Sequence, residues 1–205
     1  MTLTDGYGDV PPGKIAAVVT SLEMRAPAAA RNGGSAADDR WEIRHVERPQ
    51  PDWYRDLFKR VGEHWLWFSR LMMPTTELTS IIHDSRVEVL ALWVGDRAEG
   101  IAELDFRIAG ECELSFFGVT PAMIGSGAGR HMMNHAIARA WSHPERPIRR
   151  FWLHTCSLDH PGALGFYMRS GFTAYRRQIE IADDPRLTGR ASRTAAPHVP
   201  IIPTP

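Results

Sequence analysis

The chain has 205 residues, with 24 Lys and Arg against 24 Asp and Glu, so its formal net charge is zero. This length suits one sizeable hydrophobic core, and the balanced charge gives no support to nucleic acid or an anionic membrane as a partner. No apolar run approaches the ~18 residues of a membrane span, and the N-terminus lacks the basic and apolar regions of a signal peptide.

The first part of the chain predicts two strands and two helices, recognised by β-branched runs, by alternation, and by apolar residues at i+3 and i+4 spacing. These elements are a strand within 13–23, a linker at 25–40, a strand at 41–46, a helix from Pro51, and a short helix capped by Thr75 or Thr76.

The second part predicts alternating strands and helices in a compact order. They are strands at 87–94, 100–108 and 112–119, a helix with an apolar stripe up to Trp141, a strand at 148–155, a helix at 161–169 and a strand at 173–181. Short connections join the first three strands, so an antiparallel meander is expected. We divide the chain into an N-terminal strand and flexible linker (1–40), one α/β domain (41–183) and a proline-rich tail (184–205), which is expected to wrap the surface or stay loose.

A glycine-rich loop is the most informative feature. Gly125, Gly127 and Gly129 alternate with small residues between a strand and a helix. Glycine admits close approach to the backbone, and a helix N-terminus offers free N–H donors, so the loop suits a pyrophosphate. A P-loop is rejected because Arg130-His131 stands in place of Lys-Ser/Thr, whereas a dinucleotide fingerprint and an ordinary turn stay open.

Two motifs resemble the GNAT superfamily of acyl-CoA-dependent N-acyltransferases. The loop is similar to V-x-P-x-x-(R/Q)-x-x-G-x-G/A, and a second motif is similar to N-x-x-A-x-x-x-Y-x-x-x-G-F. The matching residues are Val119, Pro121, Gly127 and Gly129 in the first motif, and Ala163, Tyr167, Gly171 and Phe172 in the second. Ile124 and His160 depart from the pattern. The resemblance covers roughly residues 41–182.

The resemblance implies a fold and a cofactor. The fold is α/β (α+β), with a mixed, mostly antiparallel twisted sheet flanked by helices and a splayed strand pair that holds CoA. The implied reaction is acetyl transfer from acetyl-CoA, without a metal, to a primary amine. The residues expected to bind the cofactor are Phe117, Gly118, Val119, Ile124, Gly125, Ser126, Gly127, Ala128, Gly129, Arg130, His160, Ala163 and Phe166. Backbone N–H groups near Phe117 and Val119 are expected to hold the acyl carbonyl, with Gly118 permitting a bulge.

Acyl transfer needs a base for the amine and an acid for the thiolate. Glu113 is the first choice for the base, since some members of the family place a catalytic Glu at this position, six residues before Val119. Glu103 and Asp105 are rivals that share one face of the neighbouring strand. His154 is a weaker candidate, because a His in an apolar strand is usually part of the core. Tyr167 is expected to be the acid, as the family often uses it at this motif position.

The acceptor is expected to be a small molecule or a peptide. Trp67 and the carboxylates Glu103 and Asp105 are predicted to bind an amine with an apolar or aromatic body. A non-catalytic acyl-CoA-binding module and a nucleotide-dependent oxidoreductase remain as alternatives. A homodimer is a possible assembly. Cys112 and Cys156 are expected to be buried free thiols, which favours a cytoplasmic location.

Overall fold

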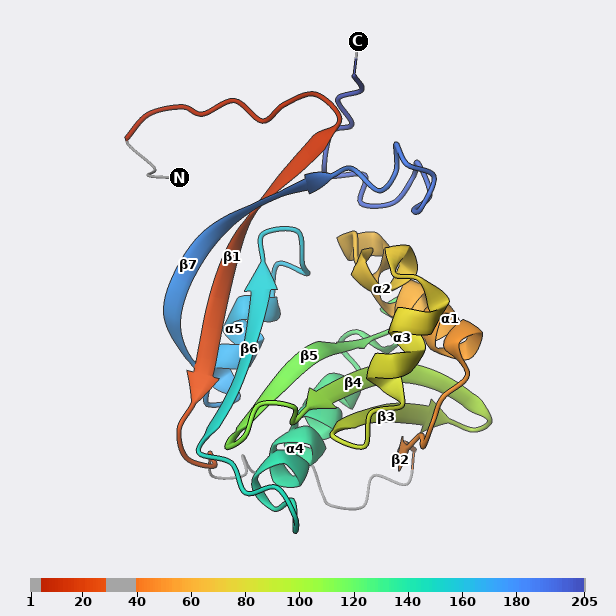
Figure 1. Ribbon diagram of the computed structural model, residues 1–205, viewed down its shortest axis with the longest axis vertical. Helices are drawn as coiled ribbons and strands as arrows, with labels where there is room; N and C mark the ends of the chain where they lie inside the picture. Colours follow the sequence, from red (N-terminus) through yellow and green to blue (C-terminus); the bar gives the residue numbers. More distant parts are fainter. Residues whose placement is uncertain (1–4, 29–39, 205) are drawn as a thin grey trace.

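The computed structural model describes residues 5–28 and 40–204 of the chain (Figure 1). The elements of its first half are β1 (Lys14–Met24), β2 (Glu42–His45), α1 (Pro51–Gly62), η1 (Glu63–Trp65), α2 (Ser69–Met72), α3 (Thr75–Ile82), β3 (Val87–Val94), β4 (Arg97–Asp105) and β5 (Glu111–Val119). Those of its second half are η2 (Pro121–Met123), α4 (Ala128–Trp141), β6 (Arg150–Cys156), α5 (Ala163–Arg169) and β7 (Thr173–Asp183).

All the strands join one 7-stranded sheet in the order β2-β3-β4-β5-β6-β1-β7. Strands β3, β4 and β5 form the predicted antiparallel meander, and β5–β6 is the one parallel pair among the strands of residues 5–28 and 40–204. The predicted fold class, a mixed and mostly antiparallel sheet flanked by helices, is confirmed.

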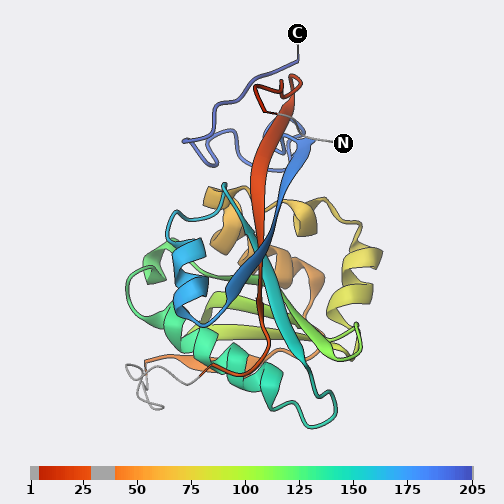
Figure 2. The same ribbon diagram turned by 90° about the vertical axis from the view of Figure 1, so that its left-hand side faces the viewer.

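The N-terminal strand belongs to this same sheet. β1 runs antiparallel between β6 and β7, so residues before position 41 supply an inner strand of the sheet built by 41–183 (Figure 2). The periodicity of the sequence indicates such a strand but contains nothing that specifies its place, because pairing over long sequence separations is decided by tertiary contacts. Residues 29–39 of the predicted linker lie outside the described part of the chain.

Helices cover both faces of the sheet. On one face α4 places Met132 and Ala136 against Leu104 of β4, within the largest buried cluster. On the other face α1 and α3 place Leu57 and Leu78 against Ile101 of the same strand, in a second cluster. Because side chains alternate between the two faces of a strand, β4 contributes residues to both hydrophobic clusters. The helices on both faces therefore pack against the same strand.

The C-terminal segment after β7 packs against the end of the sheet. Arg186 is buried and donates to Asp184, at 2.7 Å, and to the carbonyl oxygens of Ala195, Ala196 and Val199. Arg186 thereby holds together, through hydrogen bonds, turns of the C-terminal segment that lie outside regular helices and strands. Of the helices in residues 5–28 and 40–204, none combines the length and apolarity needed to span a bilayer.

Candidate active site

The two parallel strands separate where the glycine loop begins. β5 pairs with β6 only from Glu111 to Glu113. Beyond Glu113, β5 continues to Val119 with β4 as its paired neighbour. At the end of β5, the backbone groups on the side of β6 therefore have no strand partner and face a gap between β5 and β6. This is the splayed strand pair that the resemblance implies.

A β-bulge lies closer to the middle of β5 than predicted. The register between β4 and β5 shifts at Ser115, while Gly118 pairs regularly with Ile101. The predicted bulge at Gly118 is thus wrong. Gly118 instead permits close packing, because a Cβ there would lie 2.7 Å from Val61 and 3.3 Å from the Trp67 ring.

The glycine loop has the conformation that its composition predicts. Gly125 and Gly127 have φ values of 81° and 98°, a region that disfavours other residues. The Ser126 hydroxyl donates to the Met123 carbonyl at 2.7 Å and accepts from the Ala128 N–H at 3.2 Å. The next N–H groups of α4, at Gly129 and Arg130, belong to the first turn, which has no helical acceptors. A Cβ at Gly125 or Gly129 would meet no atom within 4 Å, so the loop presents an open concave backbone.

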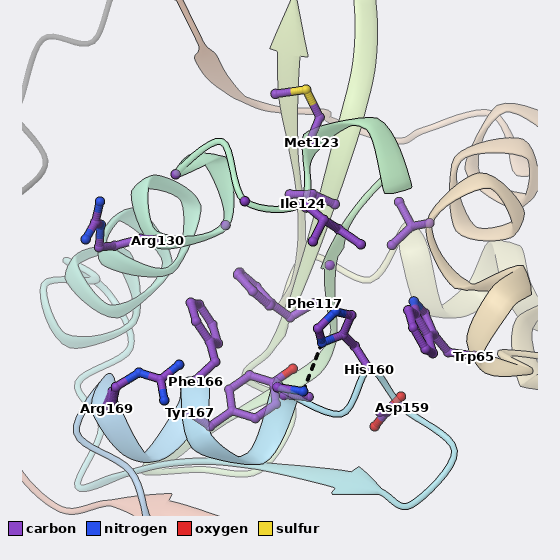
Figure 3. Close-up of a pocket in the computed structure, with 18 of the residues that line it drawn as sticks. Trp65, Phe117, Met123, Ile124, Arg130, Asp159, His160, Phe166, Tyr167 and Arg169 are labelled. Carbon is purple, nitrogen blue, oxygen red and sulfur yellow. Dashed lines mark hydrogen bonds between the residues drawn. The ribbon is translucent and has the colours of Figure 1, made fainter.

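One cavity of about 440 Å³ joins this loop, the end of β5 and the start of α5 (Figure 3). The predicted residues that line it are Trp67, Phe117, Gly118, Val119, Ile124, Gly125, Gly127, Gly129, Arg130, His160, Ala163, Phe166 and Tyr167. Ser126 and Ala128 are not among the lining residues. The first shapes the loop through its hydroxyl, and the second has its side chain in the core.

The α5 wall of the cavity is aromatic. Phe166 stacks on Phe117 with ring centroids 5.7 Å apart, and Tyr167 meets Phe117 edge-on at 6.2 Å. Burial, and secondarily the charge of Asp159, raises the pKa of Tyr167. Its hydroxyl therefore stays protonated at neutral pH. Within the described residues no group hydrogen-bonds to this hydroxyl, which leaves it available to a bound molecule.

Trp67 closes the cavity on the side of α1. Its indole N–H donates to Asp159 at 3.1 Å, and its ring lies 5.3 Å from Phe58 and 5.5 Å from Phe116. Asp159 also accepts from the Thr155 hydroxyl at 2.6 Å, so the carboxylate fixes the β6–α5 turn as well as the indole.

The C-terminal tail packs against Leu66, which lies between Trp65 and Trp67 in the sequence. Leu66 has a left-handed backbone, with φ of 53°, and its side chain is buried with Ala195 and Ala196. Trp65 and Trp67, on either side of Leu66, both line the cavity. The tail thus supports a wall of the cavity from outside.

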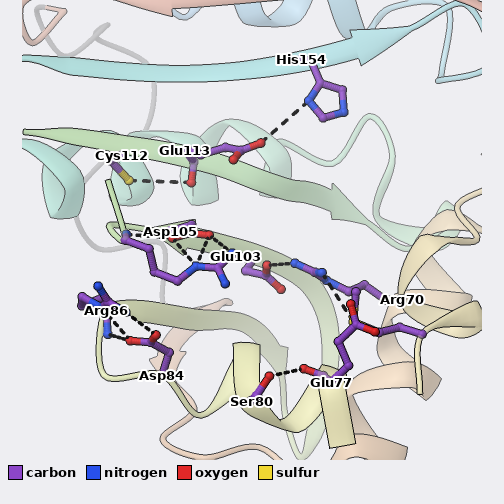
Figure 4. A network of polar contacts seen from close by, with 12 residues as sticks. Arg70, Glu77, Ser80, Asp84, Arg86, Glu103, Asp105, Cys112, Glu113 and His154 are labelled. Atoms are coloured by element: carbon purple, nitrogen blue, oxygen red, sulfur yellow. Dashed lines mark hydrogen bonds and ion pairs between the residues drawn. The ribbon is translucent and has the colours of Figure 1, made fainter. Parts of the chain in front are cut away.

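Glu113 does not line this cavity but lies on the face of the sheet opposite α4, beside His154 (Figure 4). Burial raises the pKa of its carboxyl to about 7, with further contributions from Asp105 and Glu103. One oxygen lies 3.9 Å from Nδ1 of His154. The expected core position of His154 is wrong, because its side chain is 50% exposed on the same face as Glu113.

The rival carboxylates already have cationic partners. Glu103 is fully buried and accepts from Arg70 and from the Tyr54 hydroxyl, each at 2.5 Å. Asp105 is bonded by the guanidinium of Arg107 at 2.6 Å and 2.8 Å. Both charges are therefore compensated in place, whereas Glu113 has no cation hydrogen-bonded to it within the described residues.

Sequence reasoning missed five residues that also line the cavity, namely Val61, Met123, Asp159, Gly162 and Arg169. Asp159 had a signal in the sequence, because it stands in a turn sequence after a strand, where Asp often accepts backbone hydrogen bonds. Trp65, Trp67 and Phe68 form an aromatic cluster in the sequence that is expected to lie beside the acceptor, and the first two of them line the cavity. The cysteines Cys112 and Cys156 are both free, as predicted, but Cys156 is only partly buried.

Comparisons with known proteins agree with this geometry. A sequence profile of the acetyltransferase (GNAT) family matches residues 41–172. A search of curated proteins gives no match.

Solved structures share the fold at low sequence identity. A putative acetyltransferase of the GNAT family from Novosphingobium aromaticivorans aligns with a TM-score of 0.54 and 13% identity, over 85% of this chain and 68% of that one. An aminoglycoside acetyltransferase from an uncultured soil metagenomic sample, solved with trehalose, aligns with a TM-score of 0.54 and 13% identity, over 70% and 95% of the two chains. A functionally unknown conserved protein from Staphylococcus epidermidis aligns with a TM-score of 0.52 and 16% identity, over 84% of this chain and only 63% of that one.

Proposed function

The chain belongs to the acetyltransferase (GNAT) family and is an acyltransferase, and from this we propose that it transfers an acetyl group from acetyl-CoA to a primary amine of a small molecule or peptide. The observation that carries the proposal is the single cavity that contains the glycine loop, the end of β5 and Tyr167. The family supports neither the oxidoreductase nor the non-catalytic alternative.

The residues of the cavity fit acetyl-CoA. The open backbone at Gly125 and Gly129 leaves room for a diphosphate, and the first N–H groups of α4 supply donors. Arg130 and Arg169 add positive charge at the cavity wall, while Phe117 and Phe166 offer an apolar slot to the pantetheine arm. When bound, acetyl-CoA supplies an activated acetyl group and a thiolate leaving group.

We assign the proton acceptor to Glu113. The attacking amine must be neutral, and a carboxylate with a pKa of about 7 is matched to removing a proton near neutral pH. From Glu113 to Phe117 the strand advances ~13 Å at ~3.3 Å per residue. Glu113 therefore acts through water that reaches the amine, with His154 beside it as a second polar group on this route.

The other steps belong to the end of β5 and to α5. Backbone N–H groups of β5 near Phe117 and Val119, on the side turned toward β6, hold the acyl oxygen as the amine nitrogen bonds to the acyl carbon. The carbon–sulfur bond breaks, and the Tyr167 hydroxyl gives its proton to the departing sulfur. Burial keeps that hydroxyl protonated until this step.

The acceptor side is built around Trp67. We propose that Trp67 packs against the apolar body of the acceptor. The predicted binding of a cationic acceptor by Glu103 and Asp105 is not kept in this proposal, because Arg70 and Arg107 already compensate these two carboxylates. A cytoplasmic location is part of the same proposal, supported by two free cysteines.

The experiment that tests the proposal is the release of free CoA from acetyl-CoA, measured with a thiol reagent across a panel of primary amines. The panel contains aminoglycosides, polyamines, aryl-alkylamines and peptides with free N-termini. The expected result is amine-dependent release above the hydrolysis rate, with N-acetylated product in the mass spectrum. An acetylated alcohol or thiol, with no N-acetylated product from any amine, would overturn the assignment of the acceptor.

A further inference from the structure

Strand β7 forms one end of the sheet and leaves a long edge without a partner strand. β7 pairs along its inner side with β1 and, in the part of the chain that the structure describes, with no strand on its outer side (Figures 1 and 2). All of its residues are exposed except Ala182. Such an edge offers unpaired N–H and C=O groups to another strand.

One face of the edge carries exposed apolar side chains beside Arg177. Ile179 and Ile181 of β7 are 50% and 43% exposed, and Val18, which pairs with Ile179, is 38% exposed. Exposed isoleucines in an edge strand favour its pairing with another strand, although β7 also carries charges of the kind that commonly protect natural edges.

Two charges on β7 lack partners within the described chain. Arg176 and Glu180 are both exposed, and neither forms an ion pair with a described residue. They lie on the same face of the strand but four residues apart, ~13 Å at ~3.3 Å per residue. They are therefore too far apart to bond each other within one strand.

We propose that β7 pairs antiparallel with β7 of a second copy of this chain, around a two-fold axis that passes beside Gln178. In this register Arg176 lies directly opposite Glu180 of the second copy, and the same pair forms again on the other side of the axis, as a two-fold interface requires. On the other face Ile179 lies opposite Arg177 of the second copy and diagonal to its own copy, within the reach of cross-strand contacts.

Symmetry and charge select this register among the alternatives. A two-fold axis perpendicular to the sheet leaves each side chain on the same face in both copies. Residues that lie directly opposite each other must share a face, so their numbers differ by an even number. The residue at the axis therefore lies opposite its own copy. Centring on Arg177 or Glu180 would oppose like charges. Centring on Ile179 would leave Arg176 opposite Ala182. Only the Gln178 register pairs opposite charges along the stretch from Arg176 to Glu180, and this stretch is regular because the bulge in β7 lies outside it, at Tyr175.

The test is sedimentation velocity over a wide concentration range, with charge reversals in β7. The wild-type chain is expected to approach twice its monomer mass of 23.0 kDa. Arg176→Glu and Glu180→Arg each place like charges opposite one another and should raise the dissociation constant at least tenfold. The double variant exchanges the two charges and should restore association. Arg190→Glu, an exposed reversal outside β7, is the matched control and should leave it unchanged.

Circular dichroism of each variant shows whether the monomer is still folded. A wild-type chain that is monomeric at every concentration would overturn the proposal. So would a dimer that neither reversal weakens, or a double variant no better than the singles. Ile179→Lys, which puts a charge among the exposed apolar side chains of β7, gives a further check, because it should abolish the dimer without any charge swap.

Discussion

The indole of Trp67 and the carboxylate of Asp159 are hydrogen-bonded at 3.1 Å, which joins the segment after α1 to the turn after β6. These two segments are 92 residues apart in the chain and meet over the gap between β5 and β6. The bond holds a large aromatic ring where an acyl group and its acceptor would meet, so its removal should affect acceptor binding more than protein folding.

Trp67→Phe tests this bond directly. The phenyl ring keeps much of the packing against Phe58 and Phe116 but removes the N–H donor, so the KM of the acceptor should rise several-fold while the loss of stability stays at ~1 kcal/mol. Steady-state kinetics and thermal unfolding measure the two effects. Trp65→Phe is the control, because the Trp65 indole N–H has no hydrogen-bond partner among the described residues. Equal effects of the two variants would show that the hydrogen bond is irrelevant.

Gly129 separates folding from ligand binding. It lies in the first turn of α4, where a Cβ would meet no protein atom within 4 Å, so a side chain is tolerated by the fold. Gly129→Glu should leave the melting temperature within a few degrees of wild type, yet remove the stabilisation by acetyl-CoA, since the carboxylate occupies and repels the phosphate site. Gly129→Gln has nearly the same size without the charge and should lose less. A full acetyl-CoA shift in Gly129→Glu would contradict the placement of the diphosphate.

Tyr167→Phe removes only the hydroxyl from the α5 wall. The ring contacts with Phe117 and Phe166 remain, so the affinity for acetyl-CoA should hold. Turnover should fall about 10- to 1,000-fold if the hydroxyl protonates the leaving sulfur. Calorimetry with CoA and steady-state rates distinguish binding from chemistry. Unchanged turnover would reduce Tyr167 to a packing residue.

Glu113→Gln keeps the shape of the side chain but cannot accept a proton. The value of kcat/KM should drop by about two to four decades at neutral pH. In wild type, kcat/KM should rise with pH through about 7, the pKa of this carboxyl, and that limb should vanish in the variant. Glu103→Gln and Asp105→Asn are the comparisons, and should not remove this pH-dependent limb, since Arg70 and Arg107 already hold these two carboxylates. If Glu113→Gln retains the wild-type rate, the base lies elsewhere.

The raised pKa of Glu113 also predicts a pH dependence of stability. The folded state binds this proton more tightly than the unfolded state does, so the stabilisation is fully present below 4.5 and is lost as the pH rises to about 7. At ~1.4 kcal/mol per pKa unit the loss is at most ~3.5 kcal/mol. Denaturant unfolding should therefore show Glu113→Gln gaining stability relative to wild type as the pH rises from 4.5 to 8. Parallel curves for the two proteins would argue that this carboxyl titrates normally.

Arg186 is expected to be the most sensitive residue of the C-terminal tail. Arg186→Met leaves the buried Asp184 without its guanidinium and frees the turn carbonyls, at a cost of ~3–5 kcal/mol. The Trp65–Trp67 wall should loosen as Leu66 loses its packing, which tryptophan fluorescence would report. Arg190→Met, at an exposed position nearby, should change neither signal. An unaltered melting temperature in Arg186→Met would mean that the tail contributes little to the fold.

The sequence by itself determined the strands and the longer helices, the glycine loop and the family, but not the short helices η1, α2 and η2. These depend on local physics. Alternation and helical spacing identify a face, and glycine at Gly125 and Gly127 is required wherever the backbone adopts a positive φ. Two motifs of fixed spacing then place Tyr167 on the helix that follows the strand after the loop. That information is contained within short stretches of chain, so no long-range contact is needed to read it.

The tertiary structure alone decided which distant residues meet. The place of β1 between β6 and β7, the bulge at Ser115, the Trp67–Asp159 bond and the exposed position of His154 have no local signature. Likewise, Glu103 and Glu113 look equivalent as carboxylates on strands. In the folded chain Arg70 compensates the charge of Glu103, whereas Glu113 is buried without a hydrogen-bonded cation and its pKa is raised. Electrostatic environment and strand order arise from packing between segments far apart in sequence, and for that reason only the folded chain specifies them.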